Sequence, residues 1–390
     1  MAARRSVETI YLDHSATTRV DPRVVEAMVP HFLEDYGNPN SLHYLGQRAH
    51  QALESSRRTV AEILNCTPRE IVFTGGGSES DNLALRGVAL ARQSDGRHVV
   101  TTPIEHSAVH QTLDQLRRTM GFEVTEVPVD ELGMVDPAAV AAALRPDTVL
   151  VSVMYANNEV GSVQPIAEIG ALLRARGIVF HSDAVQAGGY LPLDVQALNL
   201  DLMSLSAHKF HGPKGVGVLY IRRGTPYLPT LTGGGQEEGR RAGTQNIPYI
   251  VGLATALHLA QTERAAKNER LQAMRDHLIG GVLESVSGSR LTGHLDHRLP
   301  GHASFTIEGV EADALLLGLD LEGIAASSGS ACKSGAAEPS HVLTAMGIPR
   351  QLAMGALRLT LGDDNQPAEV ERALEVLPRV VEQLRAFAFT

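Results

Sequence analysis

The chain is poor in cysteine and in aromatic residues: its 390 residues include 2 cysteines and no tryptophan. Two cysteines cannot form the disulfide framework of a small secreted scaffold, so we expect a protein of the reducing cytoplasm. Apolar runs fall well short of the ~20 residues that a membrane-spanning helix needs. The N-terminal segment MAARRSVETIYLDHS also lacks the apolar stretch of a secretory signal. These absences argue against membrane insertion and against export.

An excess of positive charge is absent as well. The net charge is −10 at pH 7, which argues against a nucleic-acid-binding surface and against binding to anionic membranes. By contrast, 43% of the residues are hydrophobic, which is enough for a sizeable core in a chain of this length. We therefore expect a globular protein with two or more subdomains.

Short β-branched segments alternate with longer amphipathic helical patterns over the first two thirds of the chain. The expected strands are IVFT from Ile71, HVVTT from His98, TVLVSVMY from Thr148, IVFHSDA from Ile178, LMSLSAHK from Leu202 and GVGVLYI from Gly215. Apolar strands separated by helices predict a largely parallel sheet covered by helices on both faces. From about Val251 long helical patterns follow, and the last third predicts a smaller α/β layer. Ligands of such sheets bind at the carboxyl ends of the strands, so the residues that follow the strands are the candidates for a site.

The segment GGGSES, from Gly75 to Ser80, follows a strand and opens a helix. Its glycines allow close backbone approach, and the free N–H groups of a helix start favour an anion such as phosphate. The hydroxyl of Ser78 adds a donor. A tight turn with a helix cap is the alternative interpretation. A nucleoside triphosphate site is disfavoured because no Walker lysine is present.

Asp183 and Lys209 each stand at the end of an expected strand. The aspartate could cap a helix, bind a metal or pair with a buried cation. Partial burial of the lysine would lower its pKa and make the amine nucleophilic, although most lysines are solvated surface groups. A strand-end aspartate, a strand-end lysine one βα unit later and an upstream phosphate-binding turn together match the needs of a pyridoxal phosphate site.

Further candidates have equally simple structural alternatives. His106, in EHSAV, could stack on a planar cofactor ring or be a hydrogen-bonded core imidazole. Asn157, in NNEVG, could present its amide to the same face or only close a turn. The loop 233–246, GGGQEEGRRAGTQN, suits an anion or is a solvated hairpin. Arg358 lies on an expected strand and needs a carboxylate, either structural or on a substrate.

The remaining histidine and cysteine residues give weaker signals. His294, His297 and His302 lack a carboxylate or cysteine at ligand spacing, so we expect no metal site. Cys66 has no basic or histidine neighbour in sequence and is expected to fill space. Cys332 lies in SSGSACKSG, whose small residues indicate a loop. Taken alone, that segment indicates only a thiol on a loop.

A series of segments resembles one family, in the family's own order. They are YLDHSATTRVDP, GNPNSLHYLGQRA, FTGGGSESDNLAL, EHSAVHQ, MYANNEVGSVQPI, HSDAVQA, SAHKFHGPKGVG, GGGQEEGRRAGTQN, SSGSACKSGAAEPSHVLTAMG and LRLTLG. The family is the cysteine desulfurases of the NifS/IscS type, within the class V, fold type I pyridoxal phosphate enzymes. The resemblance covers nearly the whole chain. Any one segment could arise by chance, but the ordered set is highly specific.

The resemblance implies a role for each matching residue. The implied catalytic residues are Lys209, which carries the cofactor, His106, which stacks on its ring and takes part in proton transfer, and Cys332, the nucleophile that receives sulfur. Asp183 pairs with the pyridine nitrogen and Gln186 contacts the phenolic oxygen. The implied phosphate donors are Gly77, Ser78, Ser206 and His208, with Thr244 reaching across from the other protomer of a homodimer. The substrate carboxylate is assigned to Asn157, which is also a cofactor-binding residue, and to Arg358.

The resemblance also implies an architecture and a reaction. We expect a large pyridoxal-phosphate-binding domain over residues 15–262, with a mostly parallel sheet of the seven-stranded type. Residues 1–14 and 263–390 form a smaller α/β domain, which carries the catalytic loop at about 325–340. The implied reaction removes sulfur from L-cysteine, gives L-alanine and leaves a persulfide on Cys332. That sulfur passes to an iron–sulfur scaffold or a tRNA-thiolation protein, and Cys332 could transiently ligate a nascent iron–sulfur cluster.

Other functions are compatible with parts of the pattern. A selenocysteine lyase, or another class V lyase or aminotransferase, would share the cofactor site, although an aminotransferase has no use for Cys332. A non-catalytic sulfur-carrier platform is disfavoured because the lysine, aspartate, histidine and cysteine are all present. The sequence departs from the family at Glu238, where an arginine is usual, and at Lys333, where a small threonine is common. A cation beside Cys332 would lower the pKa of its thiol.

Overall fold

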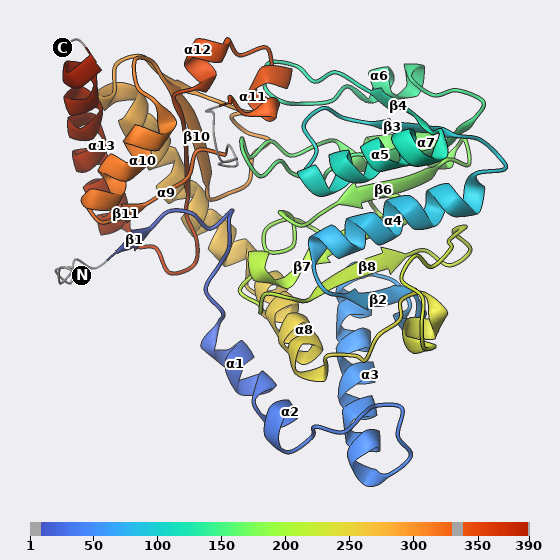
Figure 1. Cartoon of the computed structure of the whole chain (residues 1–390). Helices are drawn as coiled ribbons and strands as arrows, with labels where there is room; N and C mark the ends of the chain where they lie inside the picture. The colour runs from blue at the N-terminus through green and yellow to red at the C-terminus, as the bar shows by residue number, and fades with distance from the viewer. Residues whose placement is uncertain (1–8, 330–337, 389–390) are drawn as a thin grey trace.

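A computed structural model describes residues 9–329 and 338–388 of the chain. Cys332 and Lys333 therefore lie outside the described residues. The largest element is a seven-stranded sheet with the order β2-β8-β7-β6-β5-β3-β4 (Figure 1). Its strands are β2 (Ile71–Thr74), β3 (His98–Thr101), β4 (Glu123–Glu126), β5 (Thr148–Ser152), β6 (Val179–Asp183), β7 (Leu202–Ser206) and β8 (Gly217–Ile221).

The sheet is mostly parallel, as the sequence predicts. Strands β7, β6, β5, β3 and β4 pair in parallel, whereas β8 runs antiparallel to both β2 and β7. The strand β4 is not among the strands expected from the sequence. Its residues EVTE are exposed or half-buried at the sheet edge, so the segment lacks the apolar run that marks the other strands.

Helices cover both faces of this sheet (Figure 1). One face packs against α4 (Gly77–Arg92) and α5 (Ser107–Met120). The other packs against α3 (Tyr44–Leu64), α6 (Pro137–Ala142), α7 (Ile166–Arg174) and α8 (Ile247–Thr262). Two separate apolar clusters result, one for each face, because both faces of a parallel strand are buried. The predicted α/β class is confirmed.

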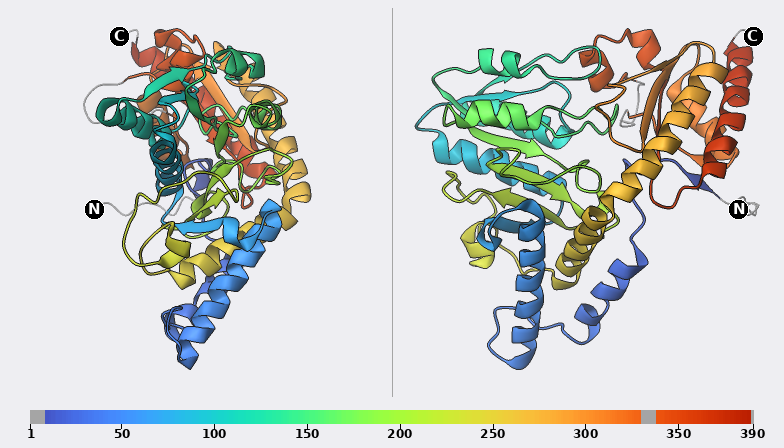
Figure 2. Two further views of the ribbon diagram at one scale, coloured as in Figure 1. Left: turned by 90° about the vertical axis from the view of Figure 1, so that its right-hand side faces the viewer. Right: turned by 180° about the vertical axis from the view of Figure 1, so that it is seen from behind.

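A second core lies in the C-terminal third. Its sheet is antiparallel with the order β12-β10-β9, and Leu12 belongs to the same apolar cluster. The N-terminal segment lies beside this part of the molecule (Figure 2). The elements are β9 (Ser289–Leu291), β10 (His302–Ile307), β12 (Ala356–Thr360), α9 (Arg264–Ser285), α10 (Ala312–Leu321) and α13 (Pro367–Ala388), with β1 (Ile10–Tyr11) paired to β11 (Ile324–Ala325).

The long helical pattern after Val251 is divided between the two cores. Helix α8 ends at Thr262 and contributes to the core of the large sheet, whereas α9 begins at Arg264 and contributes to the C-terminal core. We therefore propose the break at Glu263 as the boundary between domains of residues 15–262 and of residues 1–14 with 263–390.

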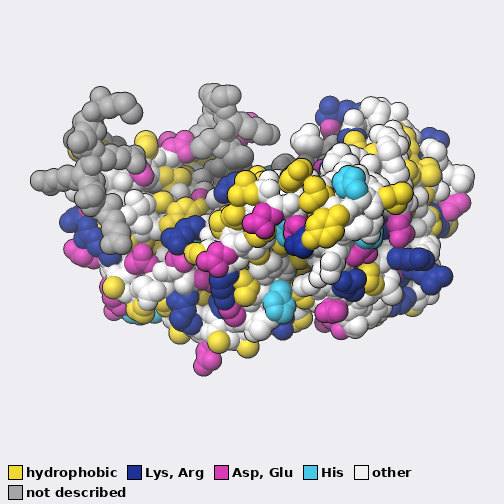
Figure 3. All heavy atoms as spheres, turned by 90° about the horizontal axis from the view of Figure 1, so that it is seen from below, with side chains coloured by type: hydrophobic (Ala, Val, Ile, Leu, Met, Phe, Trp, Pro, Cys, Tyr) yellow, Lys and Arg dark blue, Asp and Glu magenta, His cyan; other side chains and the backbone are white. Residues whose placement is uncertain are grey.

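Short elements complete the described chain. They are α1 (Pro22–Met28), α2 (Pro30–Leu33), α11 (His341–Ala345), α12 (Arg350–Ala353), η1 (Pro68–Glu70), η2 (Ala207–Lys209) and η3 (Gln236–Gly239). With the start of α3, helices α1 and α2 form an arm that projects away from the large sheet (Figures 1 and 2). The arm exposes Phe32, Leu33, Leu42 and Tyr44, and the face seen from below carries hydrophobic side chains among charged ones (Figure 3). Within the described ranges, no helix is long and apolar enough to cross a membrane.

Candidate functional site

The ends of three strands of the large sheet meet at one place. Asp183 is the last residue of β6, Lys209 follows β7 in η2, and Gly77 is the first residue of α4 after β2. A Cβ placed on Gly77 would lie 2.7 Å from a methyl group of Val185 and 3.4 Å from Cβ of Ser206. The turn before α4 therefore packs directly against the segments that follow β6 and β7, which requires glycine at this position.

Lys209 is held at the site by backbone oxygens. Its Nζ donates hydrogen bonds to the carbonyl oxygens of Ser15, at 2.5 Å, and Ala16, at 2.8 Å. Nε2 of Gln186 donates to the same oxygen of Ser15, at 3.0 Å, so these two predicted cofactor ligands lie side by side. Burial lowers the pKa of Lys209 to about 8, and the positive charge of Arg358 acts in the same direction. The expected desolvation of this lysine is confirmed, and the amine is much less basic than that of an exposed lysine.

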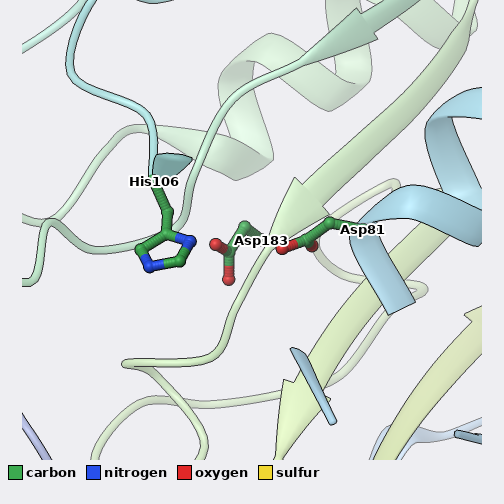
Figure 4. A group of neighbouring side chains, drawn as sticks. All are labelled: Asp81, His106 and Asp183. Atoms are coloured by element: carbon green, nitrogen blue, oxygen red, sulfur yellow. The ribbon is translucent and has the colours of Figure 1, made fainter. Parts of the chain in front are cut away.

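Asp183 lies between His106 and a second aspartate, Asp81 (Figure 4). Each of the three side chains offers a nitrogen or oxygen within 4.8 Å of the others. Burial raises the pKa of Asp183, while His106, the backbone N–H of Val185 and Lys209 act to lower it. Asp183 is thus a buried carboxyl group, and its present neighbours do not fully offset its loss of hydration. A cationic partner would stabilise its charged form.

Asp81 comes from α4 and is not a candidate in the sequence. Burial raises its pKa well above the ordinary value, and the nearby Asp183 adds to this effect. Ser204 forms a hydrogen bond with Asp81 and also lies 3.0 Å from Nε2 of His181, whose pKa burial lowers to about 3. A neutral histidine supplies no compensating charge. The sequence offers only one signal for Asp81, a carboxylate on the side of a helix that faces the sheet. Acidic residues are common near the starts of helices, so this signal does not single out Asp81.

His106 caps α5, and this selects the tautomer of its neutral ring. Its Nδ1 accepts a hydrogen bond from the backbone N–H of Ala108, at 3.1 Å. In the neutral ring the proton therefore belongs to Nε2. The side chain is exposed, and it points toward Asp183 (Figure 4). An exposed ring beside a buried carboxyl group is suited to cover a planar ligand rather than to fill the core.

Three of the predicted phosphate donors, Gly77, Ser78 and Ser206, lie at the start of α4. Ser78 is exposed in the first turn, and Oγ of Ser206 lies 3.9 Å from a Cβ placed on Gly77. His208 bonds Oγ1 of Thr17 through Nδ1, at 3.1 Å, and burial lowers the pKa of His208 to about 4. The imidazole of His208 is therefore neutral. A helix of 16 residues with N–H groups free in its first turn favours an anion here.

Thr244 is exposed in the loop between η3 and α8. This loop is anchored by Glu237, whose buried carboxylate accepts hydrogen bonds from Arg57, at 2.8 and 3.0 Å, and from the backbone N–H of Phe73, at 3.0 Å. Among the contacts of the described residues, none joins Thr244 to Gly77 or Ser206. The structure of one protomer thus leaves Thr244 at the surface, and its contact with a second protomer stays a prediction.

Arg358 lies on β12 and faces the large domain. Its Nη2 donates to Oδ1 of Asp13, at 2.8 Å, and its Nη1 donates to the carbonyl oxygen of Asn158, at 3.0 Å. Its Nε is buried without a hydrogen-bond partner in the part of the chain that the structure describes. The carboxylate that Arg358 contacts in this structure is thus the structural one of Asp13, and contact with a substrate carboxylate stays a prediction.

Asn157 is buried, and protein atoms occupy its amide. Oδ1 accepts from the backbone N–H groups of Glu159, at 2.8 Å, and Val160, at 2.9 Å. Nδ2 donates to the carbonyl oxygen of Ile104, at 3.0 Å, and approaches Sδ of Met154, at 3.4 Å. In this structure the residue braces the turn of NNEVG, so direct contact with a substrate stays a prediction.

Known proteins resemble the chain over almost its whole length. The family model described as aminotransferase class V matches residues 10–373. The chain belongs to the class V aminotransferase family. A curated relative, cysteine desulfurase IscS of Methanosarcina thermophila, is 49% identical over 378 residues, which cover 97% of this chain and 93% of the relative.

Solved structures agree with this family. A NifS-like protein superimposes with a TM-score of 0.90 at 39% identity, covering 96% of this chain and 100% of that one. The structure of SspA in complex with cysteine gives a TM-score of 0.81 at 36% identity, covering 90% and 99%. The fold expected from the sequence is confirmed, and the protein is, like other class V aminotransferases, a pyridoxal-phosphate-dependent enzyme.

The residues present fit this cofactor. A phosphate needs the N–H groups around Gly77 and Ser78, and a protonated ring nitrogen needs the buried carboxyl group of Asp183. The aldehyde needs an amine of lowered pKa, which Lys209 provides. The spacing of Asp81, His106 and Asp183 would also suit a metal ion, but the positive charge of the neighbouring Lys209 opposes one.

Proposed function

We propose that the protein is a cysteine desulfurase, which removes sulfur from L-cysteine, releases L-alanine and leaves a persulfide on Cys332. One observation carries the proposal: the amine of Lys209, its pKa lowered to about 8, lies within electrostatic reach of Arg358 and Asp183. An amine for carbon chemistry, a cation for the substrate carboxylate and a carboxyl group for the ring nitrogen are thus gathered in one place.

The cofactor half of the site is assigned to a defined set of residues. When bound, pyridoxal phosphate supplies an electron sink for the charge that develops at the substrate Cα. Lys209 holds the cofactor and, as a neutral amine, moves the Cα proton. Asp183 keeps the ring nitrogen protonated and His106 stacks on the ring. The other cofactor contacts are Gln186 and Asn157 at the ring and Gly77, Ser78, Ser206, His208 and Thr244 at the phosphate.

Sulfur transfer requires a thiolate, which we assign to Cys332. This thiolate forms a sulfur–sulfur bond with the substrate while the bond between the substrate Cβ and sulfur breaks, and the electron pair of that bond stays with carbon. Cys66 is unsuited to this role because burial raises the pKa of its thiol to about 12. Arg358 binds the substrate carboxylate, with Asn157 beside it.

The partners follow from the same proposal. A homodimer would bring Thr244 to the phosphate of a second protomer, and the exposed apolar side chains of the arm at Phe32, Leu33 and Leu42 provide surface for such contact. The persulfide would pass to an iron–sulfur scaffold or to a tRNA-thiolation protein. We place these steps in the cytoplasm.

The test measures alanine and sulfide from L-cysteine with the purified holoenzyme and a thiol reductant. We expect the parent and Cys66→Ala to release alanine and sulfide in equal amounts. In Cys332→Ala the rate of release should fall by about 10²-fold or more, because the sulfur acceptor is gone. Release of both products by Cys332→Ala at the parental rate would exclude the persulfide route. A far higher rate with L-selenocysteine than with L-cysteine would instead favour a selenocysteine lyase.

A further inference from the structure

The described residues on either side of segment 330–337 lie next to one buried carboxylate, that of Glu159. On one side is Gly329, where an added Cβ would lie 2.9 Å from Oε2 of Glu159 and 3.2 Å from its Cβ and Cγ. On the other side is Ser340, whose Oγ forms a short hydrogen bond with the same Oε2. The residues before and after the segment that contains Cys332 therefore converge on a single oxygen atom.

The direction of the bond from Ser340 is fixed by its second role. Ser340 caps α11, and its Oγ accepts hydrogen bonds from the backbone N–H groups of Val342, at 3.1 Å, and Leu343, at 3.3 Å. The lone pairs are thus used by the helix start, and the hydroxyl proton is donated to Glu159. Glu159 acts as an acceptor that locks the cap of α11 in place.

Gly329 lies close to Glu159 because it has no side chain and a positive φ of 77°. Two residues earlier, Ser327 exchanges backbone hydrogen bonds with Arg358, at 3.2 and 2.6 Å. The N-terminal flank of the segment is therefore tied to β12 by backbone bonds and to Glu159 by close packing. An alanine at position 329 would meet both a steric and a conformational obstacle.

The turn that carries Glu159 is itself part of the site. Oδ1 of Asn157 accepts from the backbone N–H of Glu159, at 2.8 Å, and the carbonyl oxygen of Asn158 accepts from Nη1 of Arg358, at 3.0 Å. The side chain of Glu159 is only 8% exposed. Burial raises its pKa, whereas the bond from Ser340 and the positive charges of His341 and Arg358 act to lower it.

Apolar packing joins the same parts of the chain. Ile104, Met154 and Val160 share one buried cluster with Val342 and Leu343 of α11. In addition, Nε2 of His341 lies 3.1 Å from the carbonyl oxygen of Glu105, the residue before His106. The cap of α11 is thus held between the turn of Glu159 and the segment that carries the stacking histidine.

We propose that Glu159 is a positioning residue for sulfur transfer, because it joins the described residues Gly329 and Ser340 on either side of segment 330–337, to which Cys332 belongs. This rests on the proposed desulfurase function. Glu159 contacts neither Lys209 nor Asp183 among the described interactions, so the carbon chemistry should depend on it far less than sulfur transfer does. Removal of Glu159 should therefore separate two steps that the parent enzyme couples.

The experiment uses the holoenzymes of the parent, Glu159→Ala and Glu159→Gln. Single-turnover formation of the persulfide on Cys332 is followed by mass spectrometry, and exchange of the Cα proton of L-alanine in D₂O is followed by NMR. We expect Glu159→Ala to slow persulfide formation by about tenfold or more, because misplacement of a reacting group by about 1 Å can cost about 10²-fold. Proton exchange and the absorbance of the bound cofactor should stay within about twofold of the parent. Glu159→Gln keeps an acceptor for Ser340 and should lie between the two.

A matched control is Glu70→Ala. Glu70 is a carboxylate of similar burial, 7% exposed, which caps η1 through Thr67 on another part of the large domain. The Glu70→Ala variant should lower the melting temperature of the holoenzyme and leave the ratio of the rates of persulfide formation and proton exchange unchanged. A loss of both rates to the same extent in Glu159→Ala would show a general effect on the site and would overturn the positioning role.

A double-mutant cycle with Gly329→Ala tests the contact itself. Gly329→Ala alone should slow persulfide formation, and in the Glu159→Ala background its further effect should be smaller, because two of the three atoms it would meet, Oε2 and Cγ of Glu159, are gone. Strict additivity would contradict the contact. If the parent forms no persulfide, the desulfurase proposal fails; if the parent forms it and Glu159→Ala forms it as fast, only the role of Glu159 is wrong.

Discussion

The two halves of the proposed site are built by different means. Asp183 and Lys209 stand at the ends of the adjacent strands β6 and β7, which pair in parallel, so the sheet itself fixes the distance between them. Gly329 and Ser340, which flank the segment of Cys332, lie outside helices and strands and are brought together by the side chain of Glu159. The carbon half inherits its geometry from backbone pairing, whereas the sulfur half depends on a few side-chain contacts. A substitution in one half should therefore slow the step of that half and leave the step of the other half largely unchanged.

The largest effect is expected from Lys209→Ala. The variant should lose about 10³-fold or more in alanine formation, because the amine that holds the cofactor and moves the proton is gone. The rate of Cys332 alkylation by iodoacetamide should stay close to that of the parent. Assays of alanine formation and of alkylation measure these two quantities, and absorbance follows the bound cofactor.

The control for this variant is Lys267→Ala, which removes a lysine that is also buried but pairs with Asp363 in the C-terminal part, at 3.5 Å. It should keep the bound cofactor. If Lys209→Ala changed the alkylation rate of Cys332 as much as the activity, the separation of the two halves would be wrong.

A smaller effect, which depends on pH, is expected from Asp81→Asn. The folded protein holds the proton of Asp81 to a higher pH than the unfolded chain does, since burial raises its pKa. The stability that this group contributes is thus present at acidic pH and is lost as pH rises toward and through the folded pKa. The melting temperature of the Asp81→Asn apoprotein, relative to that of the parent, should rise between pH 5 and pH 8.

A half-buried aspartate, Asp114, provides a control of opposite sign. Arg117 and Arg118 hold the pKa of Asp114 below its usual value, so Asp114→Asn should be least favourable at neutral pH and lose its effect toward acid pH. If the difference in melting temperature between Asp81→Asn and the parent did not change with pH, Asp81 would be ionised next to Asp183. The raised pKa of Asp81 would then be wrong.

The smallest effect is expected at Glu238, where the chain departs from the usual arginine. Its side chain is 61% exposed and lies 3.8 Å from the exposed Arg69. Glu238→Arg should change the free energy of unfolding by no more than about 0.5 kcal/mol, as is usual for such surface positions. Urea unfolding measures this change in the free energy of unfolding, and an assay of the holoenzyme measures the activity. A large loss of activity would show that the loop next to Thr244 belongs to the machinery, as a third region beside the two halves.

Much of the fold and of the carbon half could be predicted from the sequence. The strands IVFT, IVFHSDA and LMSLSAHK are short apolar runs that end in polar residues, so Asp183 and Lys209 could be placed at strand ends without coordinates. The edge strand β4 could not be predicted, because its pattern carries no buried face. Asp81 could not be recognised either, since a carboxylate on a helix is usually solvated.

Glu159 shows where prediction from the sequence ends. Its segment, NNEVG, predicts a turn, and the turn exists, braced by Asn157. Its contacts with Gly329 and Ser340 join positions far apart in the chain, and no local pattern records such a pair. The same holds for Asp13, whose bond to Arg358 links the two ends of the chain.

The alternation of strands and helices and the residue types at strand ends could be predicted from the sequence alone, because they are local properties of periodicity and composition. The family followed from the resemblance of an ordered set of segments. Tertiary structure decided which of those residues share an environment. It lowers the pKa of Lys209 to about 8 through burial and raises that of Asp183. It also brings both flanks of segment 330–337 to Glu159, because burial and contact depend on how the folded layers enclose a side chain rather than on its neighbours along the chain.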